Sequence, residues 1–217
     1  MNKLISNIEK EMLELNKITL EDISSNVKDD TALIVVDMIN GFYTEGMLAS
    51  DRVEGIITPI VNLIDNMKEC EKIIFVDNHT INSTELNTYP LHCIENSSEV
   101  EIISEIKERV LDSENYEIIK KNSINGFHAA EFKEWLDKNN QINNFIIVGV
   151  CTDICVETLA ISLVTYFNEN NIDKKIIIPK DSVETYSVGN HDGDLMNILS
   201  LFKMKSNGIN VVESIIS

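Results

Sequence analysis

The chain has little positive charge and lacks long apolar runs. Its 18 basic residues are outnumbered by 36 acidic ones, for a net charge of −18, and this balance opposes binding to nucleic acid or to anionic membranes. No apolar run approaches the length of a membrane span, and the first residues, MNKLISNIEKEMLELNK, are too charged for a secretory signal. We therefore expect a cytoplasmic protein without nucleic-acid or membrane partners.

Cysteine is also scarce and irregularly placed. Four cysteines in 217 residues show no framework spacing: Cys70, Cys93, Cys151 and Cys155. In a chain this long, such usage indicates reduced thiols in a reducing compartment. Internal repeats and low-complexity tracts are missing too. The length suits a single α/β domain with a sizeable core.

The first thirty residues form a separate segment of the sequence. Apolar residues recur there in an amphipathic pattern: Leu4, Ile8, Met12, Leu13 and Leu15. The pattern predicts a helix that packs on the domain or on a partner subunit, so it offers a surface for a homo-oligomer. A polar connector follows and ends at Asp29 and Asp30. We assign residues 1–30 to an N-terminal helical extension and residues 31–217 to the domain.

Beyond residue 30 the chain alternates between two kinds of pattern. Strand-like apolar runs lie at 32–36, 73–76, 116–119, 145–148, 175–178 and 210–212. Segments with helical periodicity lie near 53–69, 98–111, 128–138, 154–170 and 192–205. This alternation predicts an α/β fold with three α/β/α layers around a six-stranded, mostly parallel, Rossmann-like sheet.

The segment FIIVGVCTDICV, residues 145–156, is the one around which we organise the site. Its apolar run predicts a buried strand that ends at Gly149, and Thr152 and Asp153 are residue types that cap helices. Cys155 is then expected in the first turn of a helix, where the helix dipole favours the thiolate. A buried structural cysteine is an equally good interpretation of this stretch alone.

Chemically active side chains follow the predicted strands at their carboxyl ends, which we call the carboxyl-end rim. In chain order they are Asp37, Asp77 with His79, Lys120 with Lys121, Cys155, and Lys180 with Asp181. Ligands of open α/β sheets bind at this rim. Each residue has a plain alternative as a turn, cap or solvated side chain, but their shared location favours catalysis.

The chemistry of these rim residues is consistent with a cysteine hydrolase. Lys121 can stabilise a thiolate at Cys155, and Asp37 can take the thiol proton and return it to a leaving group. Backbone N–H groups of the turn at 149–155 are placed to receive an oxyanion. The residues therefore predict acyl transfer through a thioester.

A second group of residues suits a metal ion. Asp77 and His79 lie two residues apart at a strand end, and Glu85 and His92 follow on a loop that can fold back. Carboxylate and imidazole ligands at these spacings fit a divalent transition metal such as Zn, Fe or Mn. The alternative is a polar loop whose histidines lie on the surface.

These motifs resemble those of the isochorismatase-like cysteine hydrolases over residues 31–215. VVDMINGF is similar to the motif with the catalytic Asp, here Asp37, and a Phe, here Phe42. KNSINGF resembles the lysine motif and selects Lys121. GVCTDICV resembles the nucleophile motif and selects Cys155. The resemblance also implies a cis peptide between Val150 and Cys151 and an oxyanion hole from the N–H groups of Cys151 and Cys155.

The metal loop resembles that of the nicotinamidases, also called pyrazinamidases. Asp77-Asn78-His79 and Tyr89-Pro90-Leu91-His92-Cys93 match that pattern, and Glu85 occupies a suitable place for a further ligand. In that group the metal binds the pyridine nitrogen of nicotinamide, and Phe42 and Tyr89 would flank the ring. The resemblance thus implies a small-molecule amide substrate and conversion of nicotinamide to nicotinate and ammonia through a thioester.

The sequence also departs from the family pattern. Cys151 stands where a small residue is usual, and Ile124-Asn125-Gly126 replaces the commoner Tyr-Ser-Ala. Both changes bear on the wall of the pocket. The alternatives are a related hydrolase for another amide, carbamoyl or vinyl-ether substrate, and a non-catalytic binding protein on the same fold.

Overall fold

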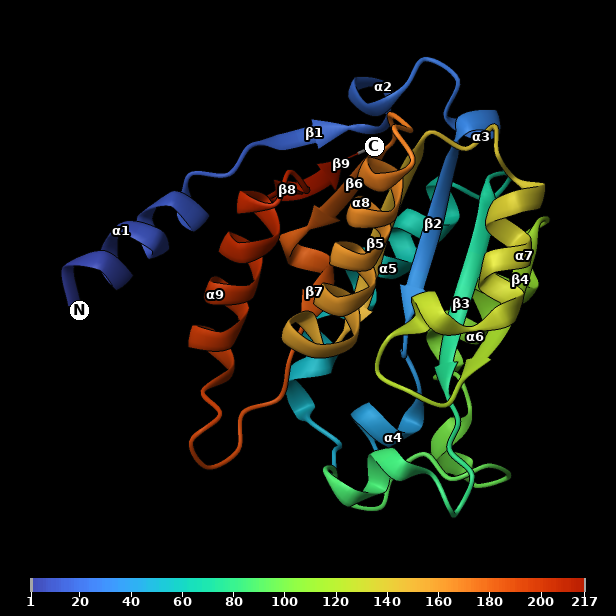
Figure 1. Ribbon diagram of the computed structural model, residues 1–217, viewed down its shortest axis with the longest axis vertical. Coiled ribbons are helices and arrows are strands. Elements are labelled where there is room, and N and C mark those ends of the chain that lie inside the picture. The colour runs from blue at the N-terminus through green and yellow to red at the C-terminus, as the bar shows by residue number, and fades with distance from the viewer. Residues whose placement is uncertain (1, 217) are drawn as a thin grey trace.

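A computed structural model describes residues 2–216, with side chains from Ile5 onward (Figure 1). The strands are β1 Lys17–Thr19, β2 Thr31–Val36, β3 Glu71–Asp77, β4 Tyr116–Lys121, β5 Asn144–Val150, β6 Lys175–Pro179, β7 Val183–Glu184, β8 Asn210–Val212 and β9 Ser214–Ile216. The helices are α1 Asn2–Leu13, α2 Leu20–Ile23, α3 Val27–Asp30, α4 Asn40–Tyr43, α5 Glu54–Asn66, α6 Ser104–Leu111, α7 Ala130–Lys138, α8 Glu157–Glu169 and α9 Gly193–Ser206.

The central sheet has the strand order β4-β3-β2-β5-β6-β8, and every pairing in it is parallel. The short strand β7 adds to the end of β5. From β2 the chain winds outward through β3 and β4 on one side, and through β5, β6 and β8 on the other. The switch point therefore lies between β2 and β5, where parallel sheets form a crevice at their carboxyl ends.

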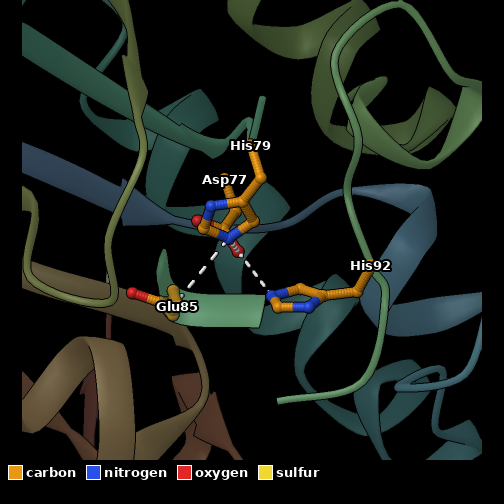
Figure 2. A group of neighbouring side chains, drawn as sticks. All are labelled: Asp77, His79, Glu85 and His92. Carbon is orange, nitrogen blue, oxygen red and sulfur yellow. Dashed lines mark hydrogen bonds and ion pairs between the residues drawn. The ribbon is translucent and has the colours of Figure 1, made fainter. Parts of the chain in front are cut away.

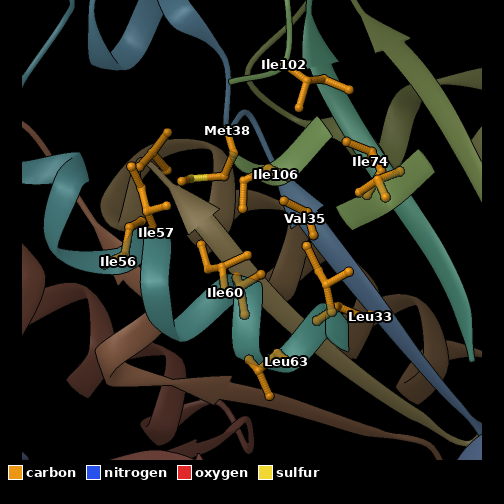
Figure 3. Close-up of a cluster of buried hydrophobic side chains, with 14 of the residues drawn as sticks. Leu33, Val35, Met38, Ile56, Ile57, Ile60, Leu63, Ile74, Ile102 and Ile106 are labelled. Atoms are coloured by element: carbon orange, nitrogen blue, oxygen red, sulfur yellow. The ribbon is translucent and has the colours of Figure 1, made fainter. Parts of the chain in front are cut away.

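Helices cover both faces of the sheet and bury two apolar clusters. All six residues of β2 are buried, and they alternate between the two faces. On one face α5 and α6 pack against the sheet and form a shared apolar cluster (Figure 3). Its members include Leu33, Val35, Met38, Ile56, Ile57, Ile60, Leu63, Ile74, Ile102 and Ile106. On the other face α7, α8 and α9 pack against the sheet and form a second apolar cluster. Its members include Ala32, Ile34, Val36, Phe75, Phe132, Trp135, Leu163 and Met204. The predicted three-layer α/β/α fold is confirmed.

All six predicted strands form the central sheet, and each of the five predicted helical segments contains a helix. The segment 98–111 is shorter as a helix, because only α6 is α-helical and a 3₁₀ turn precedes it over Ser98–Val100. No helix in residues 2–216 combines the length and apolar character needed to cross a bilayer.

The N-terminal segment differs from the polar connector that the sequence predicts. After α1 the chain enters β1, which pairs in parallel with β9 to form a separate two-stranded sheet. Met12 is buried against the domain, Lys205 pairs with Glu11 at 2.8 Å, and the side chain of Leu4 lies outside the described residues. The helix therefore packs on α9, while its use in a homo-oligomer stays a prediction. The division at residue 31 also stays one.

Candidate functional site

Four side chains meet beyond the carboxyl ends of the central strands. Asp37 follows β2, Asp77 ends β3, Lys121 ends β4, and Cys155 lies in the turn that follows β5. All four are buried. Asp37 has a φ of 52°, and its amide donates to the carbonyl of Phe75 at 3.1 Å. This left-handed residue turns the chain aside at the rim, so its carboxylate faces the neighbouring strands.

Lys121 is the centre of this group. Its Nζ lies 2.8 Å from Asp37 Oδ2, 2.9 Å from Asp77 Oδ1 and 3.8 Å from Cys155 Sγ. The neighbouring Lys120 is exposed and points away from the group. The strand alternation therefore places Lys121, and not Lys120, in the site.

The charges in this group shift one another. Burial lowers the pKa of Lys121, but the Asp37 and Asp77 carboxylates outweigh it and raise the pKa well above the ordinary value. Burial raises the pKa of Asp37 to about 6, and Lys121 opposes this shift. For Asp77, Lys121 and the nearby imidazoles outweigh burial and hold the pKa below its usual range. Asp37 is therefore the carboxylate that can exchange a proton near neutral pH.

Cys155 lies in the first helical turn after β5, as predicted, but that turn is π-helical and not α-helical. Residues Thr152–Val156 form a π-helical turn, and α8 begins at Glu157. Burial raises the pKa of the Cys155 thiol well above its usual range, more than the Lys121 ammonium lowers it. A base has to take the thiol proton when Cys155 reacts.

The backbone of the nucleophile turn, Cys151–Val156, is tightly organised. The amides of Ile154 and Val156 both donate to the Cys151 carbonyl at 3.1 Å, and the Val150–Cys151 peptide is cis. The strand β5 does not end at Gly149 as expected but continues to Val150. Gly149 has a φ of 112°, and a Cβ there would lie 2.1 Å from the Val36 carbonyl oxygen. Only glycine allows β5 to approach β2 this closely.

The second thiol in this turn has a different environment. Burial raises the pKa of Cys151 to about 12, and Thr185 and Tyr186 oppose this shift. All four cysteines are free and buried. Cys151 therefore stays protonated beside the nucleophile, without a lysine of its own.

The four predicted metal ligands come together beside this group (Figure 2). One ligand atom from each of Asp77, His79, Glu85 and His92 lies within 4.8 Å of the others. His79 Nε2 is 3.0 Å from Asp77 Oδ2 and 3.6 Å from Glu85 Oε1, and His92 Nε2 is 3.2 Å from Asp77 Oδ2. The loop after β3 folds back as the spacing predicts.

The hydrogen bonds around this quartet show which atoms are left for a cation. The Nδ1 atoms of His79 and His92 face oxygen acceptors, Asn122 Oδ1 at 3.1 Å and the Pro90 carbonyl at 2.7 Å. A proton on each Nδ1 would satisfy these acceptors and would leave both Nε2 lone pairs free for a metal ion beside Asp77. Glu85 Oε1 is buried without a hydrogen-bond partner, while Oε2 accepts from the Ile124 amide at 2.9 Å.

Four side chains that can each offer an electron pair thus converge on one point. Such a set is unfavourable without a cation, and mixed imidazole and carboxylate ligands suit a divalent transition metal. The residues present fit the predicted metal, and the fit does not select among Zn, Fe and Mn.

A cavity with an empty volume of about 340 Å³ joins the cysteine to the metal quartet. Its walls include Cys155, Asp77, His92 and Glu85 together with Phe42 and Tyr89, the two predicted ring-binding residues. The Phe42 and Tyr89 rings each lie 6.1 Å from the His92 ring, centroid to centroid. The cavity is lined by aromatic and aliphatic side chains with a few polar groups, which is the lining typical of small-molecule sites.

The structure does not bring every rim residue into the site. Lys180 Nζ donates to the Met12 carbonyl and pairs with Glu213, and the Asp181 amide donates to the Glu213 carbonyl. Lys180 thus stabilises the attachment of the N-terminal segment, and Asp181 binds the C-terminal segment.

Three groups at the site escaped the sequence analysis. Asn122 orients His79, Tyr186 lines the cavity, and Asp153 is paired with His191. The position of Asn122, directly after the catalytic lysine candidate, was the only signal in the sequence for any of them.

Comparison with known proteins agrees with this geometry. The isochorismatase domain matches residues 31–206. Nicotinamidase 1 from Arabidopsis thaliana is 28% identical over 229 residues, which cover 90% of each chain. A pyrazinamidase from Pyrococcus horikoshii in complex with zinc has a TM-score of 0.69 at 24% identity, covering 85% of this chain and 99% of that one. An N-carbamoylsarcosine amidase from Thermoplasma acidophilum has a TM-score of 0.67 at 22% identity, covering 84% and 95%.

The two solved structures share the fold with this chain. The domain match is the more specific finding, because it runs from the start of β2 to the end of α9 and includes the whole site. This protein belongs to the isochorismatase family.

Proposed function

We propose that this protein is a metal-assisted cysteine amidohydrolase that converts nicotinamide to nicotinate and ammonia. The observation that carries the proposal is the position of Lys121, between two buried carboxylates and 3.8 Å from the Cys155 sulfur. The cavity beside Cys155 is also lined by Asp77, Glu85 and His92 of the metal-ligand quartet. A relative of this chain over nearly its full length is a nicotinamidase, which supports the same substrate.

In the first half-reaction, Asp37 takes the proton of the Cys155 thiol. The sulfur then attacks the carboxamide carbon, forms a C–S bond and leaves a negative charge on the oxygen. The backbone N–H groups of Cys151 and Cys155 receive this oxyanion in the proposed oxyanion hole. The C–N bond breaks as Asp37 returns its proton to the leaving nitrogen, and ammonia departs from a thioester.

In the second half-reaction, water replaces ammonia. Asp37 takes one proton from the water, whose oxygen attacks the thioester carbon. The C–S bond breaks, nicotinate is released, and the proton held by Asp37 returns to the Cys155 sulfur. Lys121 stays protonated throughout and stabilises whichever of its partners is negative, in agreement with its raised pKa.

Asp77, His79, Glu85 and His92 would hold the metal, and Phe42 and Tyr89 would flank the ring of the substrate. A metal held there would supply a Lewis acid for the ring nitrogen of the substrate and would help to orient the carboxamide toward Cys155. Asn122 and the Pro90 carbonyl keep the two imidazoles in the ligating tautomer.

Ammonia release is the assay that tests this proposal. Purified protein loaded in turn with Zn, Fe and Mn is assayed with nicotinamide, pyrazinamide, N-carbamoylsarcosine and aliphatic amides. We expect nicotinamide to have the highest kcat/KM, and Cys155→Ala to release no ammonia. Absence of nicotinamide turnover by every metal-loaded form would refute the substrate, and turnover of a carbamoyl compound instead would favour the related hydrolase.

A further inference from the structure

The loop between β7 and α9 is tied to the turn that carries the nucleophile. Asp153, in that turn, is almost completely buried, and its two carboxylate oxygens both accept hydrogen bonds from this loop. Thr185 Oγ1 donates to Oδ1 at 2.6 Å, and His191 Nε2 lies 2.8 Å from Oδ2. The loop also closes on itself, because the amides and carbonyls of Val188 and His191 exchange two hydrogen bonds at 3.0 Å.

The imidazole of His191 is held between two acceptors. Its Nδ1 lies 3.0 Å from the Tyr186 carbonyl oxygen, and its Nε2 faces the Asp153 carboxylate. The His191 ring is therefore restrained at both nitrogens, by the Tyr186 carbonyl on one side and the Asp153 carboxylate on the other.

The His191 ring restrains the side chain of Tyr186. The two rings stack with centroids 4.0 Å apart and planes 13° apart, so the His191 ring covers one face of the Tyr186 ring. Arg52 Nε donates to the Thr185 carbonyl at 3.0 Å and anchors the residue before Tyr186. The His191 ring therefore restrains one face of the Tyr186 ring, and Arg52 restrains the backbone next to Tyr186.

Tyr186 also lines the cavity that contains Cys155. The other aromatic residues of the wall, Phe42 and Tyr89, come from the loops after β2 and β3, whereas Ile124 provides an aliphatic surface after β4. Tyr186, which follows β7 much later in the chain, adds another aromatic side chain to the wall. In the proposed function Phe42 and Tyr89 flank the substrate ring, whereas Tyr186 has no role.

We propose that Tyr186 is a specificity-determining residue whose ring forms a third aromatic wall and selects planar heteroaromatic amides. His191 and Asp153 act through it as positioning residues, because the contact between them holds the His191 ring against the Tyr186 ring. This inference rests on the proposed function, since it concerns the substrate of the same site.

The test is a set of binding measurements that does not depend on turnover. Nicotinamide is titrated by calorimetry into metal-loaded Cys155→Ala protein, and into the same protein with Tyr186→Phe, Tyr186→Leu, His191→Asn, or both of the last two. We expect Kd to stay within about twofold for Tyr186→Phe and to rise about tenfold for Tyr186→Leu, because a stacked aromatic contact is lost. His191→Asn should raise Kd as well.

The double variant separates positioning from a general structural role. If His191 acts through the Tyr186 ring, then adding His191→Asn to Tyr186→Leu weakens binding no further. In the background with an intact Cys155, Tyr186→Leu should raise KM about tenfold and change kcat by less than about threefold. Metal content and unfolding temperature are measured for each variant.

The possible results distinguish the specificity role, the positioning role and the proposed function. A Kd for Tyr186→Leu within twofold of the parent overturns the specificity role, and additive effects in the double variant overturn the positioning role. If Tyr186→Leu does not fold, an unchanged Kd for His191→Asn overturns the inference. If the Cys155→Ala parent itself binds no nicotinamide, the proposed function is refuted, and the inference is refuted with it.

Discussion

Two lysines are buried in the central sheet, at opposite ends of neighbouring strands. Lys72 lies at the amino end of β3 and Lys121 at the carboxyl end of β4, and neither side chain reaches solvent. Lys72 Nζ donates to the carbonyls of Lys68 at 2.9 Å and Cys70 at 2.8 Å, and no carboxylate of the described residues pairs with it. Lys121 contacts two carboxylates and a thiol.

The two ammonium groups therefore have opposite electrostatics. Burial lowers the pKa of Lys72, whereas the carboxylates outweigh burial and raise the pKa of Lys121. Burial alone does not mark a functional lysine; the carboxylates gathered around it do. At the amino end of the sheet the ammonium group satisfies carbonyls near the end of α5, and at the carboxyl end it organises a reactive centre.

The largest expected difference between the two lysines is in kcat when each ammonium group is removed. Lys121→Met should lower kcat by about 10²–10³-fold, because the thiolate and the oxyanion-forming step lose their nearest positive charge. Lys72→Met is the matched control and should leave kcat within about twofold. Steady-state kinetics of both variants measure this, and equal losses of kcat would show that burial, rather than the carboxylate partners, sets the role.

Metal affinity should depend on residues at the carboxyl-end rim of the sheet, such as Asn122, and not on Lys72 at the amino end of β3. Asn122→Leu removes the acceptor that fixes the tautomer of His79, so we expect metal affinity to fall about 10–100-fold. Lys72→Met should bind metal as the wild type does. Competition with a chelator, read by elemental analysis, measures the affinity. Unchanged retention in Asn122→Leu would contradict the assignment of His79 Nε2 as a ligand atom.

The pH dependence of the reaction should follow Asp37. Burial raises the pKa of this carboxyl to about 6, and only its ionised form can accept the thiol proton. The value of kcat/KM is therefore expected to be full above that pH and to fall about tenfold per pH unit below it. Wild type and Lys72→Met should give the same profile. A flat profile down to pH 5 by a protein that is still folded would exclude Asp37 as the base.

The smallest effect is expected at Lys72 itself and concerns stability alone. Lys72→Met leaves two buried carbonyl oxygens without their donor, which should lower the free energy of unfolding by about 1–3 kcal/mol. Urea denaturation at neutral pH measures this change. A variant as stable as the wild type would mean that the cost of burying the charge equals the value of its two hydrogen bonds.

Much of this architecture could be predicted from local patterns. The strand runs are continuous and β-branched, so all six were located, and the parallel fold then placed Asp37, Asp77, Lys121 and Cys155 at one rim. The metal quartet was also predictable, because a strand end fixes Asp77 and His79 on the same side.

What the sequence could not provide depends on contacts between distant segments. Thr152 and Asp153 have the character of helix caps, but Asp153 instead binds Thr185 and His191, and the turn there is a π-turn. The pairing of β1 with β9 joins two three-residue strands at opposite ends of the chain, too short for a periodic signal. The burial that controls the pKa of Cys155 likewise depends on the assembled fold.

The measurement that tests the central claim most directly is detection of an acyl group on Cys155. Metal-loaded protein is mixed with nicotinamide, quenched in acid within the first turnovers and examined by intact-protein and peptide mass spectrometry. We predict a nicotinoyl adduct confined to the peptide that carries Cys155, absent from Cys155→Ala, and increased where hydrolysis of the thioester is slowed. Ammonia release by Cys155→Ala at the wild-type rate, or an adduct on another residue, would contradict the account.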